Sequence, residues 1–202
     1  MHLYLASTSP ARLATLRAAG IEPVPIAPGV DEEAAVAAAG PLSPPDMVML
    51  LARLKAEAVA AAHPGLDGLI LGGDSAFEFE GTVYGKPHRP EVARARWLAH
   101  RGRSGRLHSG HWLIDTRTGR AVGAPAVATV NFADDISDDE VDAYIATGEP
   151  LEVAGAFTID SKGAAYIASI EGDPHAVVGL SIPLLRTLAR NLAIEWHDLW
   201  NR

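Results

Sequence analysis

The sequence predicts an α/β fold whose central sheet carries loops at one end. Short apolar runs of the length typical of strands begin at Leu3 and at Leu66. From Asp46 to His63, apolar residues recur at the spacing of an amphipathic helix. The chain of 202 residues contains no internal repeat and no linker long enough to separate independent domains. We therefore expect a single domain spanning residues 1–202.

The first quarter of the chain predicts a strand, a helix and a second strand. The first strand begins at Leu3, and the helix runs from Pro10 to Ala19, with Ser9 as its N-cap and Gly20 as its stop. The segment from Ile21 to Ile26 predicts an edge or irregular strand, because it contains two prolines. Two predicted loops follow, an acidic one at Gly29–Glu33 and a mobile, Ala- and Pro-rich one at Ala34–Pro45.

Strands and helices alternate after the helix at Asp46–His63. The run Leu66–Leu71 predicts a strand that ends at the carboxylate of Asp74, and Phe77–Tyr84 predicts a hairpin. Ser137 and Glu140 form a capping-box pattern, which indicates a helix start. The other predicted elements are a basic helix at Pro90–Arg101, strands at Leu107–Thr116, Ala126–Phe132 and Ala164–Ile170, and a final helix at Ile182–Leu192.

Composition excludes several classes of protein. The chain has no cysteine, which excludes disulfides, thiolate zinc sites and a cysteine nucleophile, and which is typical of a cytoplasmic protein. Its formal net charge is −8, which argues against a nucleic acid polymer as partner, because such partners select basic surfaces. No apolar run approaches the roughly 20 residues of a membrane span, and the N-terminus lacks the pattern of a signal peptide.

The turn between the first strand and the first helix is a candidate anion site. Ser9 and Pro10 favour a helix start, where backbone N–H groups point outward and attract anions. Ser7 and Arg12 add a hydroxyl and a guanidinium to the same turn. Phosphate is the most natural ligand for such a group, although a helix cap with no ligand explains the same residues.

Two carboxylates and two lysines are candidates for chemistry on that anion. Asp74 follows a buried strand, where a carboxylate serves as a metal ligand or as a general base for water, or simply caps a turn. Glu32 lies in a loop and is either a solvated charge or a second ligand for a hard divalent cation. The chain has only three lysines, so Lys55 and Lys86 are candidates for phosphate contacts as well as ordinary surface charges.

These pieces, in this order, resemble the Maf family of nucleoside triphosphate pyrophosphatases. The resemblance extends over nearly the whole chain, and its specificity lies in the order and spacing of many short motifs. The matching stretches are Leu5–Arg12, Val30–Glu32, Leu51–Ala56, Gly73–Ser75, Gly85–Pro87, Tyr144–Pro150, Ala154–Phe157, Ile170–Pro174 and Val177–Ser181.

The resemblance implies both a fold and a reaction. The fold is Maf/inosine-triphosphatase-like, a mixed sheet with flanking helices and two lobes around a cleft. The reaction is hydrolysis of a nucleoside triphosphate to the monophosphate and pyrophosphate with a divalent cation, Mg²⁺ or Mn²⁺. The implied phosphate ligands are Ser7, Ser9 and Arg12. Glu32 and Asp74 serve the metal and the attacking water, with Asp74 as the proton acceptor, and Lys55 and Lys86 neutralise charge on the phosphates.

Three positions depart from the family pattern and leave the nucleobase open. Many members have a second arginine where Ala11 stands. The branch that resembles dTTP/UTP pyrophosphatases has threonine at Ser75 and glutamine at Asp160. The branch that acts on 7-methyl-GTP has tryptophan, glutamine and glutamate at Ala11, Ser75 and Asp160. Asp160 accepts hydrogen bonds only, so a guanine edge or another N–H donor is one hypothesis for its partner.

Two other functions stay open at this point. The runner-up is a nucleotide-binding regulatory protein linked to cell division, with little or no turnover. A hydrolase of another phosphate ester on the same fold is the third. The combination of a general base with a metal carboxylate favours the enzyme, since a binding module does not need both together. A homodimer is an expectation from the family resemblance.

Overall fold

The computed structural model describes residues 1–201 of the chain. Within these residues seven strands form one sheet in the order β2-β1-β3-β5-β6-β7, and β4 pairs with β3. β1 is parallel to β2 and β3, whereas β4 is antiparallel to β3 and β7 is antiparallel to β6. The strands are β1 (Leu3–Ala6), β2 (Val24–Pro25), β3 (Leu69–Phe79), β4 (Thr82–Tyr84), β5 (Ser104–Asp115), β6 (Ala121–Phe132) and β7 (Ile167–Gly172). The mixed sheet and its helices confirm the predicted α/β fold.

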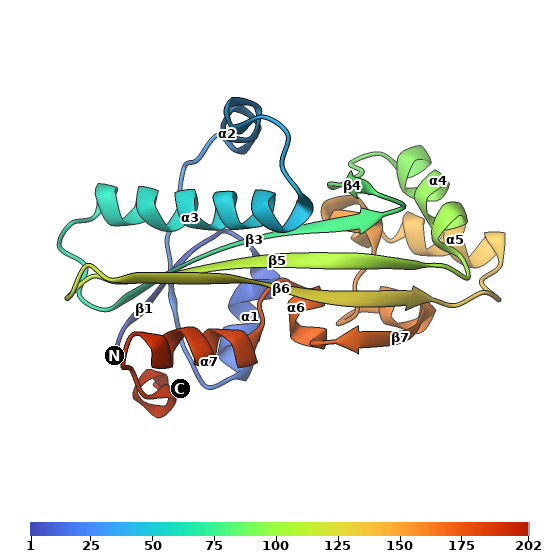
Figure 1. Cartoon of the computed structure of the whole chain (residues 1–202). Coiled ribbons are helices and arrows are strands. Elements are labelled where there is room, and N and C mark those ends of the chain that lie inside the picture. Colours follow the sequence, from blue (N-terminus) through green and yellow to red (C-terminus); the bar gives the residue numbers. More distant parts are fainter. Residues whose placement is uncertain (202) are drawn as a thin grey trace. The chain divides into compact units, whose positions relative to one another are not determined.

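Helices connect β1 to β2, β2 to β3, β4 to β5 and β6 to β7 (Figure 1). No helix within residues 1–201 is long and apolar enough to cross a membrane. The α-helices are α1 (Pro10–Ala18), α2 (Glu32–Ala39), α3 (Pro44–Ala62), α4 (Pro90–His100), α5 (Asp138–Ala146), α6 (Pro174–Val178) and α7 (Ile182–Asn191). Short 3-10 helices are η1 (Glu149–Glu152), η2 (Ala154–Ala156), η3 (Lys162–Tyr166) and η4 (Trp196–Leu199).

The chain divides into two compact units, and β3, β5 and β6 contribute residues to both. Unit 1 consists of Met1–Asp74, Ser109–Ala126 and Gly179–Arg202, and unit 2 of Ser75–His108 and Val127–Val178. Two units agree with the two lobes that the family resemblance implies. The cleft between lobes and the single-domain organisation stay predictions.

In unit 1, helices pack on both faces of the strands. Leu69 and Leu71 of β3 belong to an apolar cluster with residues of α1 and α7, whereas Ile70 packs with residues of α3. This alternation follows from the period of two along a strand. Figure 1 shows the same arrangement, with α3 along one face and α1 and α7 along the other. The strands that carry the candidate site are therefore buried on both faces.

In unit 2, aromatic side chains form the core. Phe77 of β3 meets Phe132 and Phe157 edge to face, and Trp97 of α4 meets Phe132 in the same way. The indole Nε1 of Trp97 donates a hydrogen bond to the carbonyl of Ala156 at 2.7 Å. The polar atom of the largest buried ring thus has a partner, as buried polar atoms require.

Several predicted elements have the expected bounds. The helix start at Ser137 is confirmed, because its side chain and that of Glu140 form both bonds of a capping box. Ser9 is confirmed as the N-cap of α1. The hairpin between β3 and β4 is confirmed, with Glu80 and Gly81 at its turn, both with positive φ. The long helix is confirmed and begins slightly earlier, at Pro44.

The predicted loops at Gly29–Glu33 and Ala34–Pro45 were wrong in part, since only Gly29–Asp31 and Gly40–Ser43 lie outside helices. Residues Glu32–Ala39 form helix α2, and the Asp31 side chain caps it by accepting a bond from the Ala34 N–H at 3.0 Å. Alanine has the highest helix propensity, and an aspartate cap followed by glutamates in the first turn complements the helix dipole. Gly40 ends the helix at a φ of 77°.

Three strand predictions also need correction. β3 does not end at Asp74 but continues to Phe79. In the predicted strand Ala164–Ile170, the residues up to Tyr166 belong to η3 and the strand begins at Ile167. Of the predicted strand Ile21–Ile26 only Val24–Pro25 pairs with β1, because the prolines remove donors from the ladder.

Candidate functional site

The turn between β1 and α1 is held together by the side chains predicted to bind phosphate. The Oγ of Ser7 accepts a hydrogen bond from the N–H of Ser9 at 3.1 Å. The Oγ of Ser9 accepts one from the N–H of Arg12 at 3.4 Å, the cap bond of α1. These bonds confirm a helix cap. A cap is compatible with an anion site, because the capping hydroxyls surround the helix start where an anion would bind.

Arg12 is buried beneath this turn. Its guanidinium donates to the Oγ of Ser7 at 3.1 Å and, through Nε, to the carbonyl of Gly179 at 2.9 Å. Burial lowers the pKa of Arg12, and the negative charges of Asp74 and Glu32 oppose that shift. A buried guanidinium stays charged and holds a fixed direction, so Arg12 is a rigid cation beside the two carboxylates.

Lys55 of α3 joins the two predicted metal carboxylates. Its Nζ lies 2.7 Å from an oxygen of Asp74 and 2.8 Å from an oxygen of Glu32. The side chains of Lys55 and Asp74 are only 8% and 11% exposed, whereas that of Glu32 is 49% exposed. Asp74 and Lys55 thus form a buried ion pair, and Glu32 approaches it from the solvent side on the first turn of α2.

Two glycines before Asp74 allow these contacts. At Gly72, a Cβ would overlap with the carbonyl oxygen of Ala52 on α3, so glycine lets α3 lie directly on β3. At Gly73, a Cβ would lie 3.1 Å from the Nε of Arg12. The glycine pair therefore makes room for helix backbone and for a guanidinium, as expected where something approaches a strand closely.

Asp74 lies just beyond the end of the parallel strand β1. The last pair of the β1–β3 ladder joins Ala6 to Gly72. The carboxyl ends of parallel strands are where α/β folds place ligands. Asp74 is therefore at the predicted position in the sheet, although its own strand continues past it.

The electrostatic environment of Asp74 suits a proton acceptor. Burial raises the pKa of Asp74, while the nearby charges of Lys55 and Arg12 lower it. The net shift is upward, so the carboxylate is a stronger base than one in water. With two cations beside it, the site can accept a proton and hold negative charge at the same time.

The donor set fits a hard divalent cation. Glu32 and Asp74 present carboxylate oxygens to one common point, which Lys55 Nζ fills. Mg²⁺ in proteins uses one or two carboxylates together with waters and substrate phosphates. Within residues 1–201 no group of three or more acidic or histidine side chains is arranged to hold a metal ion.

The structure brings together most of the predicted site residues within unit 1. Ala11 lies on α1, where its carbonyl accepts a bond from the Thr15 hydroxyl at 3.0 Å. Three predicted residues lie in unit 2, and their part in the same site stays a prediction; they are Ser75, Lys86 and Asp160. Lys86 is exposed and lies 3.9 Å from Glu152.

Gly179 contributes to the site without having been predicted as a site residue. Its carbonyl holds Arg12, a residue 167 positions away. No spacing rule connects two such distant positions. The only signal was that Gly179 lies in one of the family stretches, and glycine there allows its φ of 108°.

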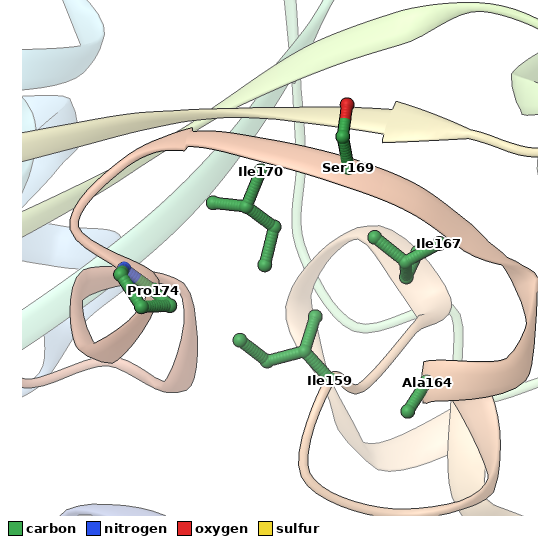
Figure 2. Close-up of a pocket in the computed structure, with 6 residues that line it drawn as sticks. All are labelled: Ile159, Ala164, Ile167, Ser169, Ile170 and Pro174. Carbon is green, nitrogen blue, oxygen red and sulfur yellow. The ribbon is translucent and has the colours of Figure 1, made fainter.

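A separate apolar recess opens in unit 2. Ile159, Ile167 and Ile170 line this recess (Figure 2), whose volume is about 310 Å³. The rest of its lining is Ala164, Ser169 and Pro174. This lining contains no charged side chain, so the recess does not suit a phosphate.

Comparison with protein families gives one match over nearly the whole chain. The family model described as Maf-like protein matches residues 2–192. This range contains every residue predicted for the site.

Several curated proteins that share one name are similar to this chain over most of their length. A protein of Leifsonia xyli subsp. xyli named "Nucleoside triphosphate pyrophosphatase" is 68% identical, and the match covers 100% of this chain and 98% of that one. A protein of Salinispora tropica with the same name is 50% identical, with 100% and 88% covered. One of Streptomyces coelicolor, also so named, is 47% identical, with 98% and 94% covered.

A solved structure also matches. It is a nucleoside-triphosphatase / dITP/XTP pyrophosphatase from Mycobacterium abscessus, 14% identical with a TM-score of 0.42, and the match covers 96% of each chain.

Proposed function

The chain belongs to the Maf family, and from this premise we propose that it is a nucleoside triphosphate pyrophosphatase. It hydrolyses a nucleoside triphosphate, deoxy or modified forms included, to the monophosphate and pyrophosphate. The observation that carries the proposal is the buried carboxylate of Asp74, paired with Lys55 at 2.7 Å beside the buried Arg12. The names of the similar proteins support the same activity.

The candidate site residues of unit 1 have separate roles in this reaction. Water attacks the α-phosphorus, and Asp74 takes a proton from it as the new P–O bond forms. The bond between the α-phosphorus and the bridging oxygen breaks, and pyrophosphate leaves with the electron pair. Arg12 and Lys55 hold the negative charge that develops, while the hydroxyls of Ser7 and Ser9 orient the phosphates.

Glu32 and Asp74 are the residues that would hold a divalent cation, Mg²⁺ or Mn²⁺. When bound, such a cation supplies charge neutralisation at the phosphate oxygens and a more acidic water. Lys55 bridges the same two carboxylates in the structure, and its ammonium would also neutralise charge on the phosphates of a bound substrate. Lys86 is proposed as a further cation for the leaving pyrophosphate.

Recognition of the base is assigned to Ala11, Ser75 and Asp160. A methyl group at Ala11 offers no hydrogen bond, and the carboxylate of Asp160 accepts but does not donate. An N–H donor, such as the edge of guanine, is therefore the chemistry that Asp160 favours. Comparison of turnover among ribose, deoxyribose and modified-base triphosphates measures the preference for the sugar and for modified bases.

A panel of canonical and modified triphosphates with Mg²⁺ or Mn²⁺ tests the proposal by release of pyrophosphate. Turnover in ¹⁸O-labelled water places the attack, because the label enters the nucleoside monophosphate when the α-phosphorus is attacked. Release of orthophosphate contradicts the proposed cleavage point. Tight binding of triphosphates without turnover favours the regulatory function instead.

The Asp74→Asn variant tests the general base. Its amide keeps the shape of the carboxylate but cannot take a proton, so kcat should fall by at least ~100-fold. Circular dichroism checks that the fold remains. Turnover close to that of the unchanged protein would exclude Asp74 as the base. The homodimer, the cytoplasmic location and the lack of a nucleic acid partner stay predictions.

A further inference from the structure

Glu149 of unit 2 accepts hydrogen bonds from an unusual number of groups. Its carboxylate lies at the start of η1, directly after Gly148, whose φ is 77°. One oxygen accepts from the Tyr144 hydroxyl at 2.9 Å, the Gly163 N–H at 3.0 Å and the Thr158 hydroxyl. The other accepts from the Ser161 hydroxyl at 2.8 Å and the Lys162 N–H at 3.3 Å.

These contacts use the full capacity of the carboxylate. A carboxylate offers about four lone-pair sites, and five donors already point at this one. Burial raises the pKa of Glu149, but the bonds from Thr158, Ser161, Gly163 and Tyr144 outweigh it and lower the pKa to about 2. Glu149 therefore stays ionised and has no site left for substrate or metal.

The five donors come mainly from one segment, residues 158–163. Thr158 and Ser161 are bound to Glu149 on either side of Asp160. The Asp160 side chain is exposed and, among the residues that the structure describes, makes no hydrogen bond or ion pair. The position of Asp160 is thus set by the backbone on which it stands.

Gly163 closes the cluster from the other end. A Cβ there would lie 2.5 Å from the Tyr144 hydroxyl oxygen and 2.7 Å from the carbonyl oxygen of Thr158. Ile159, next to Asp160, faces the apolar recess that Ile167 and Ile170 line (Figure 2). The segment is therefore held by hydrogen bonds on one side and by apolar packing on the other.

We propose that Glu149 is a positioning residue for specificity: by holding residues 158–163, it fixes the place from which Asp160 selects the nucleobase. This inference rests on the proposed function, in which Asp160 contacts the base. It explains why a carboxylate saturated with hydrogen bonds stands where no catalytic group is needed.

The variant Glu149→Gln disrupts the hydrogen bonds between residue 149 and residues 158–163 with the smallest change of side-chain shape. The amide nitrogen must replace one of the two oxygens, and it cannot accept a hydrogen bond. The serine and threonine hydroxyls can turn to accept from it, but a backbone N–H cannot. Whichever way the amide turns, the N–H of Gly163 or that of Lys162 loses its acceptor.

The experiment compares kcat/KM for GTP, ATP, UTP and dTTP in matched variants. Glu149→Gln should reduce the ratio between the best and the poorest base by roughly tenfold, with the larger change in KM. In the Asp160→Asn background, the same substitution should leave the ratio unchanged, because the group that it positions is gone. Gly163→Ala should reduce the ratio as Glu149→Gln does, without removing a charge. Glu91→Gln, an exposed carboxylate of α4, is the control for loss of charge.

Three outcomes overturn the inference. One is an equal loss for all four triphosphates with an unchanged ratio, which indicates only a structural role. Another is an additive effect of the Glu149 and Asp160 substitutions on the ratio. The third is an active enzyme that does not discriminate among bases. If the unchanged protein turns over no triphosphate in the panel, the proposed function itself fails, which the first arm of the assay reveals separately.

Discussion

Gly72 on β3 faces the carbonyl oxygen of Ala52 on α3 so closely that no Cβ fits between them. A Cβ at residue 72 would also lie 2.9 Å from the backbone N of Ala56. Lys55 lies between these two helical residues, and its Nζ reaches Asp74 at 2.7 Å. The ion pair at the candidate site therefore depends on the absence of one methyl group.

Gly72→Ala should lower both stability and activity. The methyl group has to displace backbone atoms of α3, and overpacking of this kind costs about 1–3 kcal/mol or more. The shift moves Lys55 away from Asp74, so kcat should fall even where the variant is still folded. Urea unfolding measures the first effect, and pyrophosphate release well below the unfolding midpoint measures the second.

Gly65→Ala is the matched control. No heavy atom lies within 4 Å of a Cβ at that position, and Gly65 does not adopt a positive φ. Its free energy of unfolding should change by no more than about 1 kcal/mol. We expect an increase, because alanine restricts the unfolded chain more than glycine does. Equal effects at both glycines would contradict the close packing of α3 on β3.

Local signals predicted the elements whose causes are local. The capping box at Ser137 and the N-cap at Ser9 need only neighbouring residues, and both helices start where predicted. The residues of the Maf motifs likewise predicted that Lys55, Asp74 and Glu32 meet. The meeting itself requires α2, which the alanine-rich sequence did not reveal as a helix.

Tertiary packing explains the elements that the pattern missed. The apolar run Leu66–Leu71 predicted a strand that ends at Asp74, since glycines usually weaken a strand and two of them follow this run. In the structure, the space beside each glycine is filled by another part of the chain, and β3 continues to Phe79. β5 begins earlier than predicted, at Ser104, and the added residues include Gly105, where a Cβ would overlap with the ring of Phe77. Such compensation comes from distant segments and leaves no local signal.

Lys55→Met should expose the cost of a buried, unpaired carboxylate. Removal of one partner of a buried pair costs about 3 kcal/mol, because the charge of Asp74 then lacks its nearest cation. The double variant Lys55→Met/Asp74→Asn removes the charge as well and should recover most of that loss. Urea unfolding of the two variants at neutral pH measures the difference.

Lys162→Met is the control for removal of a lysine. Lys162 is exposed, and its side chain has no ion pair among the residues that the structure describes, so its loss should change stability by less than about 0.5 kcal/mol. Two single variants of equal stability, with no recovery in the double variant, would show that the Lys55–Asp74 pair is not buried in solution.

His100 at the end of α4 is buried among aromatic rings of unit 2. It stacks on Phe132 with ring centroids 4.9 Å apart and meets Phe79 edge to face. Neither ring nitrogen has a hydrogen-bond partner in the described part of the chain. Burial, and secondarily the charge of Arg96, lowers the pKa of His100 to about 4.

The neutral state of His100 should make the protein lose stability in mild acid. Above its unfolded pKa of about 6.5, both states leave the ring neutral and His100 contributes nothing to the pH dependence. Between about pH 6.5 and 4 only the unfolded chain takes the proton, so the free energy of unfolding falls by up to about 1.4 kcal/mol per pH unit.

The variant His100→Leu should remove this pH-dependent loss of stability, whereas the variant His63→Gln, at an exposed position, should retain it. Urea unfolding at several pH values gives the free energy of unfolding of each variant and of the unchanged protein. The contributions of the other titrating groups cancel in the difference between the two. Parallel curves for His100→Leu and the unchanged protein would mean that His100 takes up its proton in the folded state.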